Sequence, residues 1–265
     1  MQTFRFLGTS AAAPTPMAGC ACPQCAEAQH ERWLQRTRPS VLLESPGGVL
    51  LVDAGPDVYQ QFARLASIPT LTALVITHAH ADHFLGLDDL GMLAQQQGWI
   101  SAQPLPVYAT VDNWPRIEAT FGQLFQAGPA QRYEARMLQL DTEQLIAGFR
   151  VRPFDSEHTI DMTTAMLAFE LGGKRLVYAS DMKMMPPAVF KGADIAIVGG
   201  TFWQREHPAH IPVLKSVRAC KRLRVQRTIV THVGHLELSN SALWAQLAAL
   251  GADLAYDGAV LTFDE

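Results

Sequence analysis

The stretch Thr77-His78-Ala79-His80-Ala81-Asp82-His83 places three imidazoles and one carboxylate within six residues. It follows the apolar run Leu74-Val75-Ile76, which indicates a buried strand. Because alternate side chains of a strand share a face, His78 and His80 are expected to point the same way. Asp82 and His83 are expected on the turn that follows. With only 9 histidines in 265 residues, a chance polar loop is the weaker explanation, and four metal-competent groups are predicted to converge.

The composition is that of a compact protein with a sizeable core: 48% of the residues are hydrophobic and 17% are charged. The net charge of -4 gives no overall attraction to nucleic acid or to an anionic membrane. No run of 18 apolar residues occurs, and residues 1–7 lack the basic start and long apolar stretch of a secretory signal. We therefore expect a cytoplasmic protein with no membrane partner.

The order of predicted elements is β-rich first and mixed later. Two strands at 41–44 and 49–53 are separated by Ser45-Pro46-Gly47-Gly48, which predicts a hairpin. Further strands are predicted at 3–7, 74–77, around 107–108, within 144–154, and at 164–171, 175–179, 194–198 and 228–231. Helices are predicted at 57–66, 82–97, 114–125, 213–222 and 239–250. No linker divides the chain, so residues 1–265 are expected to form one domain.

Three of these apolar strands end in a potential metal ligand. Val75-Ile76-Thr77-His78 is similar to Ile229-Val230-Thr231-His232, and Leu176 to Asp181 has the same form with a carboxylate last. His158 follows another apparent strand end. Each residue alone is more typical of a cap or a surface position, but together with the histidine cluster they indicate one site. Two sheets that present strand ends to a shared edge, with helices outside both, would gather them.

A second candidate metal site is the loop Cys20-Ala21-Cys22-Pro23-Gln24-Cys25. Its spacing is too tight for a disulfide framework and suits thiolates around one ion. A tetrahedral Zn²⁺ site needs a fourth ligand. His235 is favoured, because the segment His232-Val233-Gly234-His235 could then serve both metal sites, and His30 is the alternative. We therefore expect a zinc-binding cysteine loop at about residues 18–30.

The chain resembles the metallo-β-lactamase superfamily in three features of its sequence. These are the motif His78-x-His80-x-Asp82-His83, the separate residues His158, Asp181 and His232, and the upstream segment Leu51-Val52-Asp53-Ala54-Gly55. The resemblance extends over nearly the whole chain. It implies an α+β fold, a four-layer αββα sandwich, with two metal ions where the sheets meet. It further implies that His78, His80 and His158 hold one ion, that Asp82, His83 and His232 hold the other, and that Asp181 bridges them.

Such a pair of divalent ions suits hydrolysis. Ions about 3.5 to 4 Å apart can share a hydroxide, lower its pKa and stabilise both oxygens of a displacement. Asp53 and Asp257 are expected to orient imidazoles through the ring nitrogen that faces away from the metal. For both, an ordinary turn aspartate is the alternative reading.

The cysteine loop and the late His232-x-x-His235 resemble one branch of the superfamily, as does Tyr256-Asp257-Gly258. That branch includes the phosphoribosyl cyclic phosphodiesterase of the carbon-phosphorus lyase pathway. The resemblance implies Mn²⁺ or Zn²⁺ in the active site and a structural zinc in the cysteine site. A pyrroloquinoline-quinone biosynthesis protein shares the cysteine loop but lacks much of the histidine motif. Retention of the full motif here favours an enzyme.

His210 is a further catalytic candidate together with Asp82. It directly precedes the helix predicted at 213–222, where phosphodiesterases of this superfamily place a histidine near the phosphate or the leaving oxygen, and helix N-terminal amides favour an anion. A solvent-exposed loop histidine is the alternative.

The sequence thus predicts a dinuclear phosphodiesterase that acts on a small cyclic phosphate such as phosphoribosyl 1,2-cyclic phosphate. The alternatives are an RNA-processing nuclease of the RNase Z type and a non-hydrolytic biosynthetic or carrier protein. The basic cluster at 218–227 lacks interleaved aromatic residues, which argues against a nucleic acid partner. A homodimer is an open expectation. Residues 86–131 contain no recognisable motif and are expected to form part of the pocket wall.

Overall fold

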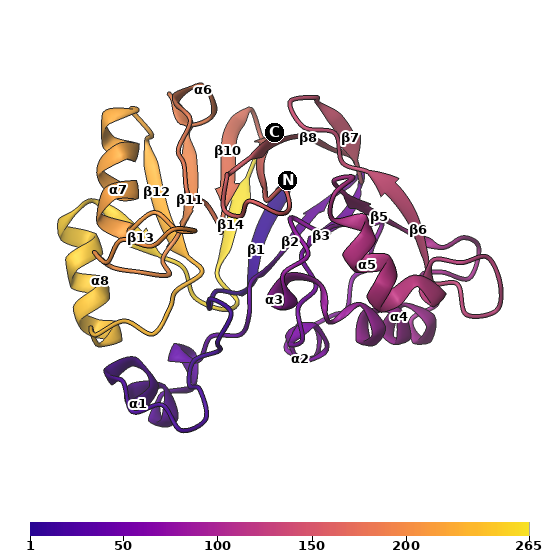
Figure 1. Cartoon of the computed structure of the whole chain (residues 1–265), viewed down its shortest axis with the longest axis horizontal. Helices are drawn as coiled ribbons and strands as arrows, with labels where there is room; N and C mark the ends of the chain where they lie inside the picture. The colour runs from indigo at the N-terminus through magenta and orange to yellow at the C-terminus, as the bar shows by residue number, and fades with distance from the viewer. Residues whose placement is uncertain (265) are drawn as a thin grey trace.

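Two seven-stranded sheets pack face to face, with helices outside both, in the computed structural model, which describes residues 1–264 (Figure 1). The first sheet has the order β14-β1-β2-β3-β4-β5-β6 and the second has the order β13-β12-β11-β10-β9-β8-β7. Helices α2 to α5 lie outside the first sheet, and α7 and α8 lie outside the second (Figure 1). This is the predicted α+β, four-layer αββα sandwich.

The strands of the first sheet are β1 (Gln2–Gly8), β2 (Ser40–Ser45), β3 (Gly48–Val52), β4 (Ala73–Val75), β5 (Leu105–Ala109), β6 (Tyr133–Met137) and β14 (Val260–Phe263). Those of the second are β7 (Gln144–Ile146), β8 (Phe149–Asp155), β9 (Ala165–Leu171), β10 (Lys174–Ala179), β11 (Ile195–Gly199), β12 (Arg227–Thr231) and β13 (Ala252–Leu254). The helices are α1 (Pro23–His30), α2 (Val58–Ala63), α3 (Ala81–Phe84), α4 (Leu87–Gln96), α5 (Trp114–Phe121), α6 (Pro187–Phe190), α7 (Val213–Arg222) and α8 (Asn240–Ala249), with 3-10 turns at Arg32–Leu34 and Gly122–Leu124.

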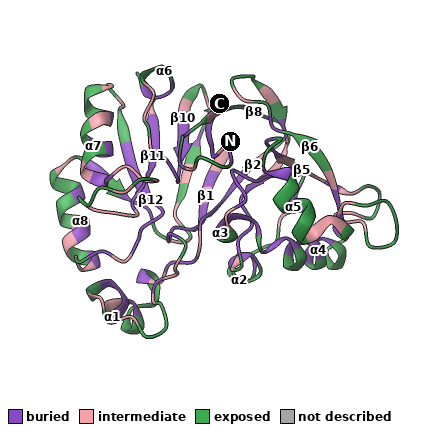
Figure 2. Cartoon of the chain, viewed as in Figure 1, coloured by how far each residue is buried: buried purple, intermediate pink, exposed green. Residues whose placement is uncertain are grey.

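Three apolar layers hold the sandwich together, and the strands contain many of the buried residues (Figure 2). The layer between the sheets contains Phe4 and Phe6 from β1, and Phe169 and Tyr178 from β9 and β10. Two further layers pack the outer sheet faces against the helices, and in α4 the residues Leu87, Leu90 and Leu93 repeat at helical spacing toward the sheet. Each fully buried aliphatic or aromatic side chain contributes on the order of 2 kcal/mol.

The helix predicted at 82–97 is interrupted. It is divided into α3 and α4 at Leu85 and Gly86. Gly86 donates its N–H to the carbonyl of Ala54, and a Cβ at Gly86 would lie 2.1 Å from the carbonyl oxygen of Gly55. The close approach of the 53–55 turn therefore breaks the helix, which hydrophobic periodicity alone does not reveal.

Several other element boundaries differ from the sequence expectation. Strand β4 ends at Val75, so His78 and His80 lie on the loop that follows and not in the strand, while Asp82 and His83 lie in α3. Helix α5 ends at Phe121, and the remainder of the predicted segment forms a 3-10 turn. Strands β6, β13 and β14 were not predicted, because they are edge strands of only five, three and four residues.

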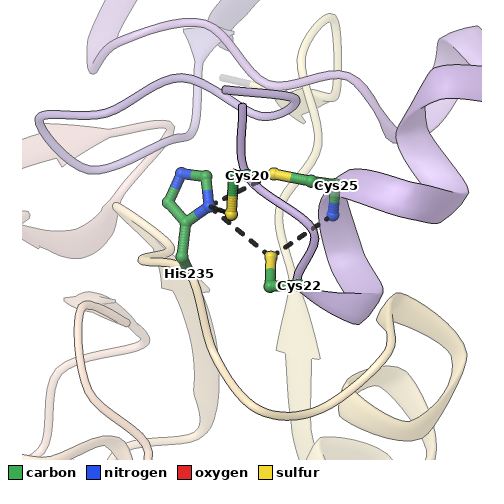
Figure 3. Close-up of side chains that lie close together, drawn as sticks. All are labelled: Cys20, Cys22, Cys25 and His235. Carbon is green, nitrogen blue, oxygen red and sulfur yellow. Dashed lines mark hydrogen bonds between the residues drawn. The ribbon is translucent and has the colours of Figure 1, made fainter. Parts of the chain in front are cut away.

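The N-terminal cysteine segment projects from the sandwich as a small lobe with helix α1 (Figure 1). Its three cysteines face His235, which belongs to the loop after β12 (Figure 3). Helix α1 also contacts α8, because Glu27 accepts hydrogen bonds from the backbone and side-chain amides of Asn240. The lobe is thereby attached to the second sheet and its outer helices.

The longest described helices have 10 residues, and none combines the length and apolarity that crossing a bilayer would require.

The close packing at Gly55 leads to a stability prediction. A Cβ at this position would lie 2.1 Å from the carbonyl oxygen of Asp82, so Gly55→Ala must displace the start of α3. We expect a loss of about 2 kcal/mol in the free energy of unfolding, measured by urea denaturation. Gly122→Ala is the control, because nothing lies within 4 Å of the place its Cβ would take, and it should change stability by less than about 0.5 kcal/mol. Equal effects of the two substitutions would contradict this packing argument.

Candidate metal centre

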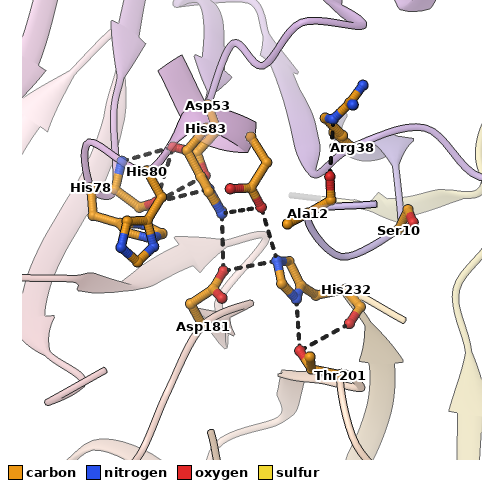
Figure 4. Close-up of polar contacts among 12 residues, drawn as sticks. Ser10, Ala12, Arg38, Asp53, His78, His80, His83, Asp181, Thr201 and His232 are labelled. Atoms are coloured by element: carbon orange, nitrogen blue, oxygen red, sulfur yellow. Dashed lines mark hydrogen bonds and ion pairs between the residues drawn. The ribbon is translucent and has the colours of Figure 1, made fainter. Parts of the chain in front are cut away.

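Seven predicted ligands from both sheets meet at one edge of the sandwich, and Figure 4 labels His78, His80, His83, Asp181 and His232 among them. The first sheet supplies four of them from the loop after β4 and from helix α3, and the second sheet supplies the other three after β8, β10 and β12. The backbone joins the two sheets here, since the N–H of Ala165 at the start of β9 donates to the carbonyl of Thr77 at 3.0 Å. This hydrogen bond attaches the loop that carries His78 and His80 to the second sheet.

One group of potential ligands consists of His78, His80 and His158, whose nearest ring nitrogens lie within 4.8 Å of one another. Nε2 of His78 is 2.9 Å from Nδ1 of His80. His78 and His158 are buried, whereas His80 is partly open to solvent. This arrangement suits three imidazole ligands with one open side.

The second group consists of Asp82, His83 and His232, also within 4.8 Å. Nε2 of His83 lies 3.2 Å from Oδ2 of Asp82, and Nε2 of His232 lies 3.5 Å from the same oxygen. His232 has a φ of 52°, in the left-handed region that is uncommon for residues other than glycine. This turn directs the chain out of β12 at the point where the ring faces the carboxylate.

Asp181 lies between the two groups. Its Oδ2 is 3.1 Å from Nε2 of His83 and 3.2 Å from Nε2 of His232, while its Oδ1 is 3.8 Å from Nε2 of His158. One oxygen therefore faces each group, as a bridging carboxylate requires.

The donor set fits divalent cations. Oδ2 of Asp181 and Nε2 of His83 and His232 are buried and have no hydrogen-bond partner among the described residues. Buried polar atoms are normally paired, so each such atom needs an explanation. Imidazole nitrogens and carboxylate oxygens are ligands of Zn²⁺ and similar ions, and a cation would satisfy all three atoms at once.

The electrostatics lead to the same conclusion. Burial lowers the pKa of His83, but Asp82, Asp53 and Asp181 outweigh burial and hold that pKa well above its ordinary value. Burial raises the pKa of Asp181, but His232 and His83 outweigh it and hold that pKa well below its ordinary value. The buried carboxylates thus require positive charge, which a proton on His83 supplies when no metal ion does.

Two of the ligand imidazoles, those of His83 and His158, are oriented through the ring nitrogen that faces away from the other ligands. Nδ1 of His83 donates to Oδ2 of Asp53 at 2.7 Å, and Thr77 donates its N–H and hydroxyl to Asp53. Nδ1 of His158 donates to the carbonyl of Ala209 at 2.7 Å. Asp53 thus has the geometry expected of a residue that orients a metal-binding imidazole.

Asp257 does not have this geometry, and the sequence prediction for it is wrong. Its carboxylate accepts hydrogen bonds from the backbone and hydroxyl groups of Thr9 and Thr37, at 2.7 to 2.9 Å. Arg64 lies 3.5 Å away. No imidazole among the described residues contacts Asp257. It joins the loop after β1 to the C-terminal segment, which a motif match could not distinguish from a role at the metal site.

His210 lies beside the centre. Its Nδ1 is 3.8 Å from Oδ1 of Asp181 and 3.4 Å from Oγ1 of Thr201, and its ring centroid is 4.5 Å from that of His158. His210 precedes α7 by three positions, with Pro212 as the N-cap, so it does not directly precede the helix. Burial lowers the pKa of His210 to about 3. The neighbouring imidazoles also lower this pKa, whereas the carboxylate of Asp181 raises it. The ring is therefore neutral at pH 7.

The cysteine cluster has the geometry of a separate metal site. Nδ1 of His235 lies 3.4, 3.6 and 3.2 Å from Sγ of Cys20, Cys22 and Cys25. Nε2 of His235 donates to the carbonyl of Pro14 at 3.1 Å, which leaves the lone pair of Nδ1 toward the thiols. Burial raises the pKa of Cys25 to about 12, so a thiolate there needs a nearby cation. His30, the alternative fourth ligand, is exposed at the end of α1.

Two orienting groups were missed from the sequence. Oγ1 of Thr201 lies 3.0 Å from Nδ1 of His232 (Figure 4), and the carbonyl of Ala209 contacts His158. A threonine after a buried strand carries no distinctive signal. A backbone carbonyl carries none at all, because every residue has one.

Comparisons with known proteins agree with this architecture. The family model described as the beta-lactamase superfamily domain matches residues 49–233. A solved structure of a new diphosphatase from the PhnP family superposes with a TM-score of 0.84 at 26% identity, and the alignment covers 98% of this chain and 96% of that chain.

Two curated relatives match over most of this chain. Coenzyme PQQ synthesis protein B from Cupriavidus necator is 25% identical over 97% of this chain and 98% of its own length. An octanoyltransferase from Porphyromonas gingivalis is 26% identical over 86% of this chain. The match covers 45% of the octanoyltransferase, so the chain spans about half the length of that relative.

The two candidate sites should lose metal independently. Asp181 faces both groups of active-site ligands, so Asp181→Ala should lower the occupancy of both ions there and spare the cysteine site. Cys22→Ser should remove about one zinc per chain and lower the melting temperature. Metal content per chain, measured by mass spectrometry after dialysis, tests both. Equal loss of all metals in both variants would contradict two separate sites.

Metal uptake should depend on pH. The pKa of His83 is held well above its ordinary value, so the metal-free ring keeps its proton through neutral pH. A metal ion must displace that proton, so the apparent affinity should rise as the pH increases from 6 to 8, by about tenfold per unit for each proton released. Titration calorimetry in buffers of different ionisation enthalpy would count the protons. An affinity independent of pH would contradict this assignment.

Proposed function

This chain belongs to the metallo-β-lactamase superfamily, and on that basis we propose that it is a metal-dependent phosphodiesterase acting on a small cyclic phosphate. Phosphoribosyl 1,2-cyclic phosphate is the substrate type we favour. The proposed ligands are His78, His80 and His158 for one ion and Asp82, His83 and His232 for the other, with Asp181 between them.

One observation carries the proposal: two ligand groups share Asp181, and His210 lies beside the same carboxylate. Two divalent ions at such a centre would activate water near neutral pH and offset the charge of a phosphate group. Asp82 and Asp181 would bring negative charge that the ions balance. His80, on the open side, would lie closest to an entering substrate.

The part of His210 follows from its protonation state. Because burial holds its pKa at about 3, His210 would act as a neutral imidazole and donate one hydrogen bond. A donor directed at the leaving oxygen stabilises the negative charge that develops there. This role requires no net proton loss from the ring.

A diphosphate is the second candidate substrate. It is favoured by the similarity to the PhnP-family diphosphatase, at 26% identity over nearly the whole of both chains. A diphosphate and a cyclic diester would make the same demands on the centre: charge neutralisation, activated water and a donor at the leaving oxygen. A diphosphate lacks the ring strain of a five-membered cyclic phosphate. The rates of hydrolysis of the two substrates can therefore be compared to decide between them.

Two further functions stay as alternatives. An RNA-processing nuclease would use the same ligands, and a non-hydrolytic biosynthetic protein would only bind a ligand. The similarity to coenzyme PQQ synthesis protein B extends over nearly the full length of both chains. The experiment must therefore also test the non-hydrolytic alternative. The complete set of seven ligands favours a catalyst over a carrier.

Turnover with added Mn²⁺ or Zn²⁺ tests the proposal. We expect hydrolysis of a ribose 1,2-cyclic phosphate and of bis(p-nitrophenyl) phosphate, with His210→Ala lowering kcat for the cyclic substrate by on the order of 100-fold. His30→Ala is the control, because His30 is exposed at the end of α1 and belongs to none of the ligand groups. Phosphate release would be the measurement.

The substrate panel should also contain a nucleoside diphosphate sugar and a precursor tRNA. Faster hydrolysis of the nucleoside diphosphate sugar would indicate a diphosphatase. Faster cleavage of the precursor tRNA would indicate an RNA-processing nuclease. No turnover of any substrate, with two ions bound per active site, would overturn the enzymatic function.

A further inference from the structure

The loop between β11 and α7, residues 200–212, carries His210 and touches both halves of the metal centre. Near its start, Oγ1 of Thr201 lies 3.0 Å from Nδ1 of His232. Near its end, the carbonyl of Ala209 accepts from Nδ1 of His158 at 2.7 Å. The N–H of Ile211 also donates to the carbonyl of Met182, next to Asp181, at 3.0 Å. The loop is therefore positioned by the ligands themselves.

The hydrogen bond between Thr201 and His232 has a defined direction. Nε2 of His232 faces Oδ2 of Asp181 at 3.2 Å and has no hydrogen-bond partner among the described residues. If Nε2 is to offer its lone pair to a cation, the single proton of the neutral ring must be on Nδ1. Nδ1–H then donates to the hydroxyl oxygen of Thr201.

A hydroxyl that accepts one hydrogen bond still has its own proton to donate. Two acceptors are within reach of Thr201: Nδ1 of His210 at 3.4 Å and the carbonyl oxygen of His232 at 3.5 Å. Both distances are long for a hydroxyl donor, and the imidazole nitrogen is the nearer of the two acceptors. In that arrangement the proton of the neutral His210 ring is on Nε2.

One carboxylate competes for the same nitrogen. Oδ1 of Asp181 lies 3.8 Å from Nδ1 of His210, which is too long for a hydrogen bond. If the hydroxyl of Thr201 were removed, Asp181 would be the nearest remaining group and would favour a proton on Nδ1. Nε2 of His210 makes no hydrogen bond within residues 1–264. Whether Nε2 carries the proton of the neutral ring is therefore decided by the groups that contact Nδ1.

We propose that Thr201 is a positioning residue: its hydroxyl accepts from Nδ1 of His232 and donates to Nδ1 of His210, so that His210 presents Nε2–H to the leaving oxygen. The inference rests on the function proposed above. It adds that one hydroxyl couples the orientation of a metal ligand to the donor state of the catalytic histidine. The step is a hydrogen bond, and no atom or proton is transferred from Thr201.

The tautomer can be read without any turnover. ¹⁵N spectra of histidine-labelled, zinc-loaded protein should show His210 with its proton on Nε2. Thr201→Val, which keeps the shape of the side chain and removes the hydroxyl, should move the proton toward Nδ1, and Thr201→Ser should restore the Nε2–H form. An unchanged tautomer in the valine variant, or a serine variant that behaves like valine, would overturn the inference.

Kinetics give an independent readout when both variants are compared at full metal occupancy. Thr201→Val should lower kcat by on the order of 100-fold for diphenyl phosphate, whose leaving oxygen is the more basic of the two, and by less than about threefold for bis(p-nitrophenyl) phosphate. Equal losses on both substrates would indicate a merely structural role and overturn the inference. Thr120→Val on the exposed face of α5 is the matched control and should leave both rates unchanged. If the wild-type protein hydrolyses neither diester, the ¹⁵N spectra still decide the role of Thr201, and the proposed function is decided separately by the full substrate panel.

Discussion

Buried negative charge is the constraint on which the rest of this structure depends. The carboxylates of Asp53, Asp82 and Asp181 are all less than a tenth exposed and gather around the imidazole of His83. Isolated buried carboxylates are strongly unfavourable unless they are paired, hydrogen-bonded or bound to a cation. Hydrogen bonds from Thr77 and His83 satisfy Asp53, but Oδ2 of Asp181 makes no hydrogen bond within residues 1–264 and has only the nearby rings of His83 and His232 beside it. The fold therefore concentrates charge where positive ions would stabilise it.

The sandwich makes this concentration possible because its two sheets are joined at the edge that carries the ligands. The N–H of Val233, just after His232, donates to the carbonyl of Thr9 in the first-sheet half at 2.8 Å. The N–H of Ala54 donates to the carbonyl of His83 at 2.7 Å, which holds α3 against the turn after β3. These backbone bonds resist separation of the two ligand groups and so support a preorganised centre.

The superfamily accommodates several activities on this frame, and fold alone does not choose among them. The similar proteins include a diphosphatase and a coenzyme synthesis protein. What distinguishes such functions must lie in the groups around the shared centre. In this chain the loop 200–212 is the clearest such group, because it carries His210 and contacts His158 and His232.

The sequence by itself indicated the candidate ligands and the order of most strands and helices, because hydrophobic periodicity and the spacing of the histidine motif are local properties. The sandwich followed from the resemblance of the motifs to the superfamily. The sequence also indicated His235 for the cysteine site through its distance from His232. Only the tertiary structure decided the break between α3 and α4, the contacts of Asp257 and the parts played by Thr201 and Ala209. Each of these depends on the approach of backbone or side chains more than 25 residues apart in the chain, and such contacts leave no local pattern.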